Sequence, residues 1–370
     1  MNPNDAVPTT PHSIAQAGAV AAARLREWLL SGAVQLSGND PESGGVAGAL
    51  EADGRPRYVY AEITGYYLSW LADVATIAPP DQVRERARLA TEWSWRAFGV
   101  EGRMPQTRIY LDAAEPDWRN DAVFFFDLSM LLRGLTAVAE AGIEAPPRLL
   151  VDSLVAQLAQ FVENDTLRAA RALHADAVLP QRWSTLGGPF LVKASSRVAL
   201  ADGLCELPPS LLRACALESA RWSPVAARIP LDMLHPTLYF AEGLLLAEPG
   251  RADAIATLLT RCFALQNADG SLPESESGST LKRSDIIAQA LRIGLLLRQG
   301  GIAGSPSDHS LDRLAAALLR RVAHDGSIAF DPAAPTREPN VWCAMFAEQA
   351  LRWYADWREN ATPARIEALV

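Results

Sequence analysis

The feature that most constrains this chain is an apolar and aromatic run with a single acidic residue near its start. It covers residues 57–71, RYVYAEITGYYLSWL, and the acidic residue is Glu62. The pattern indicates a helix that is apolar on most of its sides, and such a helix must be buried on most of its sides. Similar segments occur five more times, alternating with amphipathic helical patterns. The sequence therefore predicts an all-α protein.

Twelve helices are expected in this alternation. The mostly buried ones are predicted at about residues 57–78, 124–142, 190–204, 235 onward, 284–297 and 340–357. The half-exposed ones are predicted at about residues 13–30, 81–98, 147–162, 210–221, 251–266 and 311–323. In the last of these, Arg313, Arg320 and Arg321 are expected to face the solvent. No convincing run shows the period of two that indicates a strand.

The loops repeat as well. Residues 101–105, 269–273 and 325–329 each follow an amphipathic pattern and precede an apolar one. A repeat of roughly 50–60 residues indicates stacked helical hairpins, whereas an open solenoid, the alternative, has shorter repeats of about 34–47 residues. An inner set more apolar than the outer set also favours closure. We therefore predict an (α/α)6 toroid that forms one domain over residues 13–370, after a flexible N-terminus of residues 1–12.

Composition excludes several classes of function. The net charge of −9, with no basic cluster to offset it, argues against a nucleic-acid partner. No apolar run approaches the roughly 20 residues that span a bilayer, and the first residues lack the pattern of a signal peptide, so we expect a cytoplasmic protein without membrane insertion. The cysteines at 205, 215, 262 and 343 are far apart, which predicts buried free thiols rather than disulfides or zinc ligands.

Short motifs, in order along residues 55–357, resemble a known superfamily. They are YAEITGY at 60–66, FD at 126–127, LRGL at 132–135, HPTLY at 235–239 with EG at 242–243, RSD at 283–285 with AQA at 288–290, and NVW at 340–342. Together they resemble the six-hairpin glycosidase-like superfamily and, more narrowly, bacterial proteins associated with polysaccharide biosynthesis. The resemblance implies an (α/α)6 toroid that acts on carbohydrate.

A second resemblance is discounted. The loop QNADGS at 266–271 is similar to the repeat loop of triterpene cyclases, another α/α toroid. Leu272 stands where that motif has Trp, and the acidic DxDD and DDxxD clusters that start cyclisation are absent from the sequence. Terpene chemistry is therefore a minor alternative.

The candidate site follows from the toroid. Inner helices of such a ring run parallel, so residues at their N-termini converge on one face; these are Glu62, Asp127, His235, Asp285 and Asn340. A glycoside hydrolase needs two carboxylates, about 5 Å apart for retention or about 6.5–9.5 Å apart for inversion. We expect Glu62 to be the acid and Asp127 or Asp285 to be the base. Which helices face each other stays open.

Other residues near the helix starts and in the loops are predicted to bind the saccharide, because sugar rings stack on aromatic faces and polar groups bind hydroxyls. They are Tyr60, Tyr66, Trp118, Arg119, His235, Tyr239, Arg283, Asn340 and Trp342. Each has a structural alternative. Asn340 and Ser284 are typical N-cap residues, Asp285 complements a helix dipole, and His235 precedes a proline at a helix start. Tyrosines and Trp342 are often core residues.

The leading hypothesis is a carbohydrate-active, glycoside hydrolase-like enzyme whose ligand is a small molecule or an oligosaccharide. The competing class is a non-catalytic toroid that binds a glycan or a protein. A sugar epimerase on the same fold is also possible; it would use histidine acid/base pairs, and His235 is the best placed histidine. No metal-ligand spacing or phosphate-binding loop is present, so no metal or cofactor is expected. The oligomeric state is left open.

Overall fold

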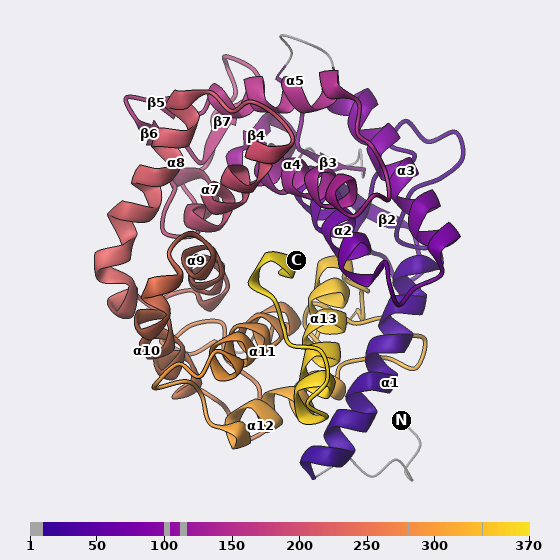
Figure 1. Ribbon diagram of the computed structural model, residues 1–370. Helices are drawn as coiled ribbons and strands as arrows, with labels where there is room; N and C mark the ends of the chain where they lie inside the picture. Colours follow the sequence, from indigo (N-terminus) through magenta and orange to yellow (C-terminus); the bar gives the residue numbers. More distant parts are fainter. Residues whose placement is uncertain (1–9, 100–103, 112–116, 280, 335) are drawn as a thin grey trace. The chain divides into compact units, whose positions relative to one another are not determined.

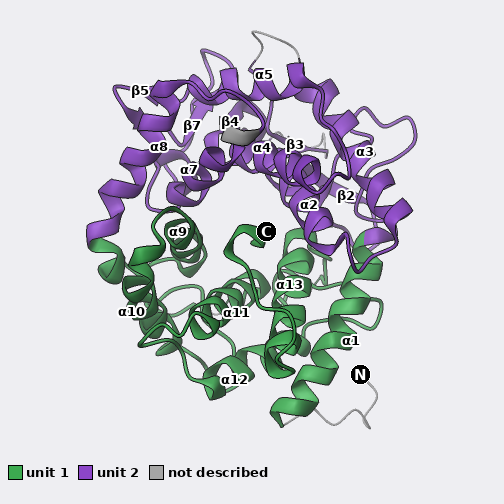
Figure 2. Cartoon of the chain, viewed as in Figure 1, with its two compact units in different colours: residues 1–29, 225–369 green, residues 30–224, 370 purple. Residues whose placement is uncertain are grey.

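The computed structural model describes residues 10–99, 104–111, 117–279, 281–334 and 336–370. Within this part of the chain the dominant elements are thirteen α-helices, and the strands are few and short (Figure 1). The predicted all-α class is confirmed. The chain divides into two compact units (Figure 2): unit 1 comprises Met1–Leu29 and Val225–Leu369, and unit 2 comprises Leu30–Pro224 with Val370. Each is described by itself, and the single domain over 13–370 stays a prediction.

Unit 2 contains three mostly buried helices, α2 (Ala61–Val74), α4 (Phe125–Glu140) and α7 (Leu191–Ala199). Its half-exposed helices are α3 (Pro80–Phe98), α5 (Arg148–Ala159) and α8 (Pro209–Trp222), and α6 (Trp183–Leu186) is a single turn. Helix α4 packs against both α2 and α7. The contact with α2 is close because two glycines meet there: a Cβ on Gly134 would lie 2.3 Å from the carbonyl oxygen of Gly65.

Strands directly precede two of the buried helices in unit 2, α2 and α4, which corrects the prediction that residues 57–60 begin a helix. These residues lie in β2 (Pro56–Tyr60), which pairs with β1 (Ala47–Leu50) and β3 (Arg108–Tyr110). Aromatic and β-branched residues favour a strand, and helix α2 begins only at Ala61. The other strands are β4 (Ala122–Phe124) paired with β7 (Ala170–Ala172), and β5 (Val162–Glu163) paired with β6 (Thr166–Leu167).

Unit 1 has the same alternation. Its mostly buried helices are α9 (Leu234–Ala247), α11 (Ser284–Gln299) and α13 (Val341–Arg358). Its half-exposed helices are α1 (Pro11–Leu30, whose last residue falls in unit 2), α10 (Ala252–Phe263) and α12 (Asp308–Leu319). Helix α11 packs against α9 and α13. Helix α1 begins two residues before the predicted start, and residues 1–9 of the expected flexible N-terminus lie outside the described part. Short 3-10 turns occur at Trp118–Asp121, Leu200–Gly203, Ser223–Arg228, Pro249–Arg251 and Ile366–Ala368.

Two of the repeated loops are built alike. Gly270 and Gly326 both adopt positive φ angles, of 84° and 83°. A Cβ on Gly270 would lie 2.4 Å from the carbonyl oxygen of Arg313 on the next half-exposed helix, and a Cβ on Gly326 would lie 2.2 Å from that of Arg24 on α1. Only glycine permits both the backbone conformation and the close approach. The third predicted loop, residues 101–105, lies largely outside the described part.

A backbone hydrogen bond fixes the start of four buried helices in the same way. In each, the first N–H of the helix donates to a carbonyl in the loop that leads to the next buried helix. The pairs are Ala61 to Thr107 (2.9 Å), Phe125 to Ala169 (3.0 Å), Leu234 to Glu274 (2.8 Å) and Ser284 to Phe330 (2.8 Å). None of these four helices has a side-chain N-cap. The loop carbonyl takes over that role, because the first N–H groups of a helix need a partner.

Candidate functional site

Most of the predicted site residues lie at one recurring position, the first turn of the buried helices. Glu62, His235, Asp285 and Trp342 are each the second residue of their helix, and Asp127 is the third residue of α4. The backbone bonds described above hold these helix starts against the loops. Each unit therefore gathers its own set of predicted residues, which are described separately.

In unit 2 the predicted carboxylates meet an arginine from β3, and we call this set the Arg108 cluster (Arg108, Asp127, Glu62 and Tyr60). Asp127 is fully buried, and Arg108 donates to its two carboxylate oxygens from Nε at 2.7 Å and from Nη2 at 2.8 Å. The same Nη2 lies 3.6 Å from Oε2 of Glu62. A bidentate pair of this kind is among the stronger charge-assisted contacts.

Aromatic rings enclose the Arg108 guanidinium. Its central carbon lies 4.7 Å from the ring centroid of Tyr60 and 3.9 Å from that of Phe124. Burial alone would lower the pKa of Arg108, but the charge of Asp127 raises that pKa well above its ordinary value. Burial also raises the pKa of Tyr60, whose hydroxyl lies 2.5 Å from that of Tyr110. The cluster is thus a buried, permanently charged cation with carboxylates around it.

The other predicted residues of unit 2 lie apart from this ion pair. Trp118 and Arg119 are half-buried in the 3-10 turn, and Arg119 binds the carboxylate of Asp117 at 2.7 Å while its guanidinium lies 5.4 Å from the ring centroid of Tyr110. Tyr66 lies in the core of α2 at 2% exposure, and the ammonium of Lys193 lies 4.7 Å from its ring centroid. The core alternative therefore describes Tyr66 better than a place at the surface of a site.

Unit 1 brings five predicted residues together, and we call this set the Asp285 cluster (Asp285, Arg283, His235, Trp342 and Tyr239). Asp285 is fully buried. Its Oδ2 accepts from Arg283 Nη2 at 2.7 Å and from Trp342 Nε1 at 3.2 Å, and it lies 3.3 Å from His235 Nδ1. Its Oδ1 accepts from Arg283 Nε at 3.1 Å. One carboxylate thus holds a cation, an indole and an imidazole.

The neighbours of His235 determine its tautomer. Nδ1 lies 2.8 Å from Oε1 of Gln289 and 3.3 Å from the carboxylate of Asp285. A carboxylate only accepts hydrogen bonds, so Nδ1 carries the hydrogen and Gln289 presents its oxygen. Both of these contacts are made by Nδ1, so in the neutral ring the lone pair is on the other nitrogen, Nε2. The Tyr239 ring lies 4.3 Å away, centroid to centroid.

Electrostatics fix the protonation state of Asp285. Burial alone would raise its pKa, but the charge of Arg283, followed by His235 and the hydrogen bonds from Arg283 and Trp342, lowers that pKa well below its ordinary value. Asp285 is therefore ionised at neutral pH and is a weak base. Its geometry suits a residue that orients a partner, because the partner's N–H is held by a fixed anion.

The N-cap alternative, which was offered for both Asn340 and Ser284, holds for the first residue and not for the second. Asn340 is the N-cap of α13, and its side chain accepts from the backbone N–H of Cys343 at 2.9 Å, so the capping alternative is confirmed for it. The same alternative is wrong for Ser284, which is the first residue of α11 and donates to the carbonyl of Ala329 at 2.7 Å. The cap position is occupied by Arg283, because the chain enters this helix one residue earlier than the cap prediction requires.

A second polar layer lies deeper in unit 1. Arg292 donates to Glu242 Oε1 at 2.8 Å and to Gln349 Oε1 at 2.9 Å, and all three side chains are fully buried. Each lies seven residues after a member of the Asp285 cluster on the same helix. Arg292 follows Asp285 on α11, Glu242 follows His235 on α9, and Gln349 follows Trp342 on α13. Seven residues are about two helical turns, so both layers lie on the same helix faces. The deeper layer ties together the three helices that carry the Asp285 cluster.

Three residues that belong to these clusters or contact them were not predicted as site residues. Arg108 lies in a stretch expected to be an irregular loop, and no spacing in the sequence relates it to Asp127. Gln289 is one turn after Asp285, which is a readable signal, because residues four apart share a helix face. Glu274 lies 3.4 Å from Arg283 and belongs to a loop.

The described residues also bear on metals, thiols and membranes. Within this part of the chain no group of three or more His, Cys, Asp or Glu side chains is arranged to hold a metal ion. The four cysteines are buried thiols outside any disulfide of the described residues, as predicted, and burial raises the pKa of Cys262 to about 12. No described helix is long and apolar enough to cross a membrane.

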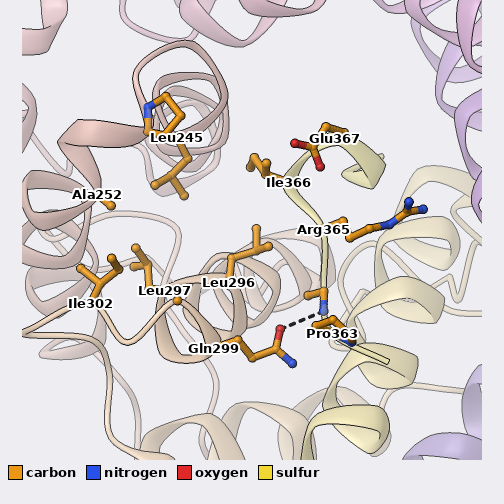
Figure 3. A pocket seen from close by; sticks show the side chains of 13 residues that line it. Leu245, Ala252, Leu296, Leu297, Gln299, Ile302, Pro363, Arg365, Ile366 and Glu367 are labelled. Carbon is orange, nitrogen blue, oxygen red and sulfur yellow. Dashed lines mark hydrogen bonds between the residues drawn. The ribbon is translucent and has the colours of Figure 1, made fainter. Parts of the chain in front are cut away.

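A cavity of about 450 Å³ lies at the other end of the buried helices of unit 1 (Figure 3). Its walls come from the C-terminal ends of α9 and α11 and from residues 363–367, and the backbone N–H of Ala364 donates to Gln299 Oε1 at 2.8 Å. Leu245, Leu296 and Ile302 make most of the wall in Figure 3 apolar. None of the predicted site residues lines it.

No known family model matches this sequence, and no curated protein does. Solved structures do match. A cellobiose 2-epimerase from Spirochaeta thermophila DSM 6192 has a TM-score of 0.66 at 14% identity, over 95% of this chain and 99% of that one. A D-mannose isomerase has a TM-score of 0.64 at 12% identity, over 91% and 97%. An unsaturated glucuronyl hydrolase specific for heparin has a TM-score of 0.64 at 10% identity, over 94% and 98%. At these identities the likeness shows the fold, which is the (α/α)6 toroid predicted from the sequence.

Proposed function

We propose that this protein is a carbohydrate-active enzyme that transfers a proton on a reducing sugar, the chemistry of sugar isomerases and epimerases. The observation that carries the proposal is the contact of His235 Nδ1 with Gln289 and with the ionised Asp285. A base that is held by a fixed orienting group is the geometric signature of an acid/base residue. The epimerase and isomerase among the solved structures of this fold support the same class of chemistry.

The expected step removes a proton from the carbon next to the carbonyl of the open-chain sugar. Nε2 of His235 accepts that proton, the electron pair of the C–H bond forms the C=C bond of the enediol, and the carbonyl oxygen takes a proton from water. Transfer of the proton from Nε2 to the neighbouring carbon, while the hydroxyl on the original carbon loses its proton to water and becomes the new carbonyl, gives the isomer. The epimer requires a proton delivered to the original carbon from the opposite face, by water rather than by His235. Asp285 stabilises the charged imidazolium, while Trp342 and Tyr239 offer aromatic surface to the sugar.

The test is exchange of hydrogen for deuterium. The wild-type protein is incubated in D₂O with reducing mono- and disaccharides, and deuterium at the carbon next to the carbonyl is measured by NMR. We expect exchange with at least one sugar. His235→Asn keeps an N–H donor near the position of Nδ1 and removes Nε2, so exchange should fall by about 10²- to 10⁴-fold.

The matched control is His324→Asn, because His324 is exposed and lies outside the cluster. This variant should exchange as fast as the wild type. An absence of exchange across the sugars, or a His235→Asn variant that exchanges normally, would refute proton transfer by this residue.

Glycoside hydrolysis is the second candidate, and Glu62 favours it. Nη2 of Arg108 lies 3.6 Å from Oε2 of Glu62, whereas Asp127 and Asp285 each accept from an arginine with both carboxylate oxygens. Glu62 also keeps 9% of its surface exposed. Asp127 and Asp285 are each held by an arginine, which does not suit a base that must accept a proton. Release of reducing ends from oligosaccharides, lost in Glu62→Gln and retained in His235→Asn, would favour this candidate. A place in polysaccharide biosynthesis remains a proposal from the sequence motifs.

A further inference from the structure

A second charged region of unit 1 lies outside both clusters. A cavity of about 300 Å³ is lined by Lys282, Arg320, Arg321 and Asp269, among others. Three of these four side chains are cationic and one is anionic. Positive charge is concentrated here in a chain whose net charge is −9. A second cavity of about 310 Å³ shares Asp269 and Arg320 with the first and adds Arg313 to its wall.

Arg321 is the unusual member of this set. It was predicted to face the solvent, but α12 ends at Leu319, so the helical pattern no longer sets its direction, and its exposure is only 6%. Its Nη1 donates to the carbonyl of Lys282 at 2.6 Å and to the hydroxyl of Ser284 at 3.1 Å. No carboxylate of the described residues forms an ion pair with it; Asp269, Asp331 and Asp285 act on it from farther away.

Three other buried arginines of the described chain differ in this respect. Arg108, Arg283 and Arg292 each bind a carboxylate within 2.8 Å. The charges of their carboxylates raise the pKa of Arg108 and of Arg283, whereas burial lowers the pKa of Arg321. A guanidinium stays charged in proteins, and a buried charge without a counter-ion is costly. An anion in the cavity would supply that counter-ion.

The other two cations of the cavity, Lys282 and Arg320, are also placed to bind an anion there. Lys282 Nζ binds Asp269 Oδ2 at 2.8 Å and is 42% exposed, so its ammonium lies at the opening. Arg320 donates to the backbone carbonyl of Asp269, which leaves its charge without compensation from that contact. Of the three cations, Lys282 is the one that pairs directly with the Asp269 carboxylate. Arginine forks and a lysine ammonium are the groups that proteins use for oxyanions.

We propose that this cavity, lined by Lys282, Arg320 and Arg321, binds a tetrahedral oxyanion: a phosphate or sulfate group, free or carried by a small molecule. Inorganic phosphate is the simplest probe. Binding to the full-length protein is measured by titration calorimetry and by the melting temperature at pH 7, with no sugar present. Sodium chloride of the same ionic strength is the reference, because screening alone changes stability.

Lys282→Gln is the main variant, since its partly exposed side chain can be changed without disturbing the core. The affinity for phosphate should fall by about tenfold, the effect of removing one charge-assisted contact. The matched control is Arg298→Gln, because Arg298 is 47% exposed and pairs with Asp308 at 2.8 Å, much as Lys282 pairs with Asp269. This control should bind phosphate like the wild type.

Phosphate and sulfate stabilise many proteins without binding to a site, so the variants decide the interpretation. Heat of binding in the wild type and in Arg298→Gln, reduced in Lys282→Gln, supports the site. An equal response in all three proteins, or no heat beyond that of chloride, overturns it. If sulfate competes with phosphate the site takes either group; if not, it selects phosphate. Either result is independent of deuterium exchange, so this proposal and the proposed function can fail separately.

Discussion

The Arg108 cluster and the Asp285 cluster each contain a buried Asp–Arg ion pair, but the two clusters are organised around it in opposite ways. Each places a fully buried aspartate in the first turn of a buried helix and binds it bidentately with an arginine. In unit 2 the arginine is the centre, because Glu62 also faces it and aromatic rings surround it. In unit 1 the aspartate is the centre, because it also holds Trp342 and His235. A central cation fixes carboxylates; a central anion orients an imidazole.

The first prediction concerns Asp285, the central residue of the Asp285 cluster, and it has the largest expected effect on the rate of deuterium exchange. Asp285→Asn removes the charge that orients His235, so the rate of deuterium exchange should fall by about 10³- to 10⁴-fold. It also leaves Arg283 buried without its main partner, which should lower the free energy of unfolding by several kcal/mol, about 3 to 5. Exchange is measured below the melting temperature of the variant. A normal rate would show that Asp285 is structural only.

The second prediction makes the corresponding change in unit 2. Asp127→Asn leaves Arg108 without its bidentate partner, so urea denaturation should show a loss of about 3 to 5 kcal/mol in the free energy of unfolding. Exchange by the folded fraction should change little, because His235 is untouched. If this variant lost exchange as completely as Asp285→Asn does, the distinction between the two clusters would be wrong.

The third prediction concerns acid. The folded pKa of Asp285 lies below its ordinary value of 3.8, so its ionised form stabilises the protein above that pH, and the contribution is lost as pH falls below about 4. The difference in unfolding free energy between the wild type and Asp285→Asn should therefore be constant from pH 7 to pH 5 and smaller at pH 3. Urea midpoints at each pH measure it. A difference that grows toward pH 3 would contradict the sign.

The fourth prediction has the smallest effect and separates the two residues that hold His235. Gln289→Leu removes one acceptor of Nδ1 and keeps Asp285, so exchange should slow by about tenfold, the value of one hydrogen bond. Stability should change little, because the buried Nε2 of Gln289 has no hydrogen-bond partner among the described residues. A loss as large as that in Asp285→Asn would make Gln289 the principal orienting residue.

The helices could be predicted because burial leaves a periodic pattern. The starts of α9, α11 and α13 fall within a residue of the expected positions, and this placed His235, Asp285 and Trp342 correctly in first turns. The strand at residues 57–60 was missed because a short aromatic run reads equally well as the first turn of the helix that follows. Arg321 was assigned to the wrong side because helical periodicity was extended beyond the end of α12.

The partners within the site could be predicted less well. His235 and Asp285 meet because α9 and α11 pack together, which the alternation of helices makes plausible. Arg108 comes from a strand in an apparently irregular loop and reaches a helix that begins seventeen residues later in the chain. No periodic pattern encodes such a contact, so it is found only when the loop's path is known.

Unit 1 is built from two segments that lie far apart in the sequence, and this has a consequence for folding during synthesis. Helix α1 is synthesised before the rest of unit 1, but Arg26 pairs with Glu348 at 2.8 Å, and Arg24 and Trp28 pack against the loop at Gly326. Its apolar residues, such as Leu25 and Leu29, therefore lack their native partners until the last helix is made. Unit 2 can begin to fold meanwhile, because nearly all of its residues are contiguous. The nascent chain thus carries this helix without its native partners while the residues between α1 and α13 are made, and truncation before α13 should yield a protein prone to aggregation.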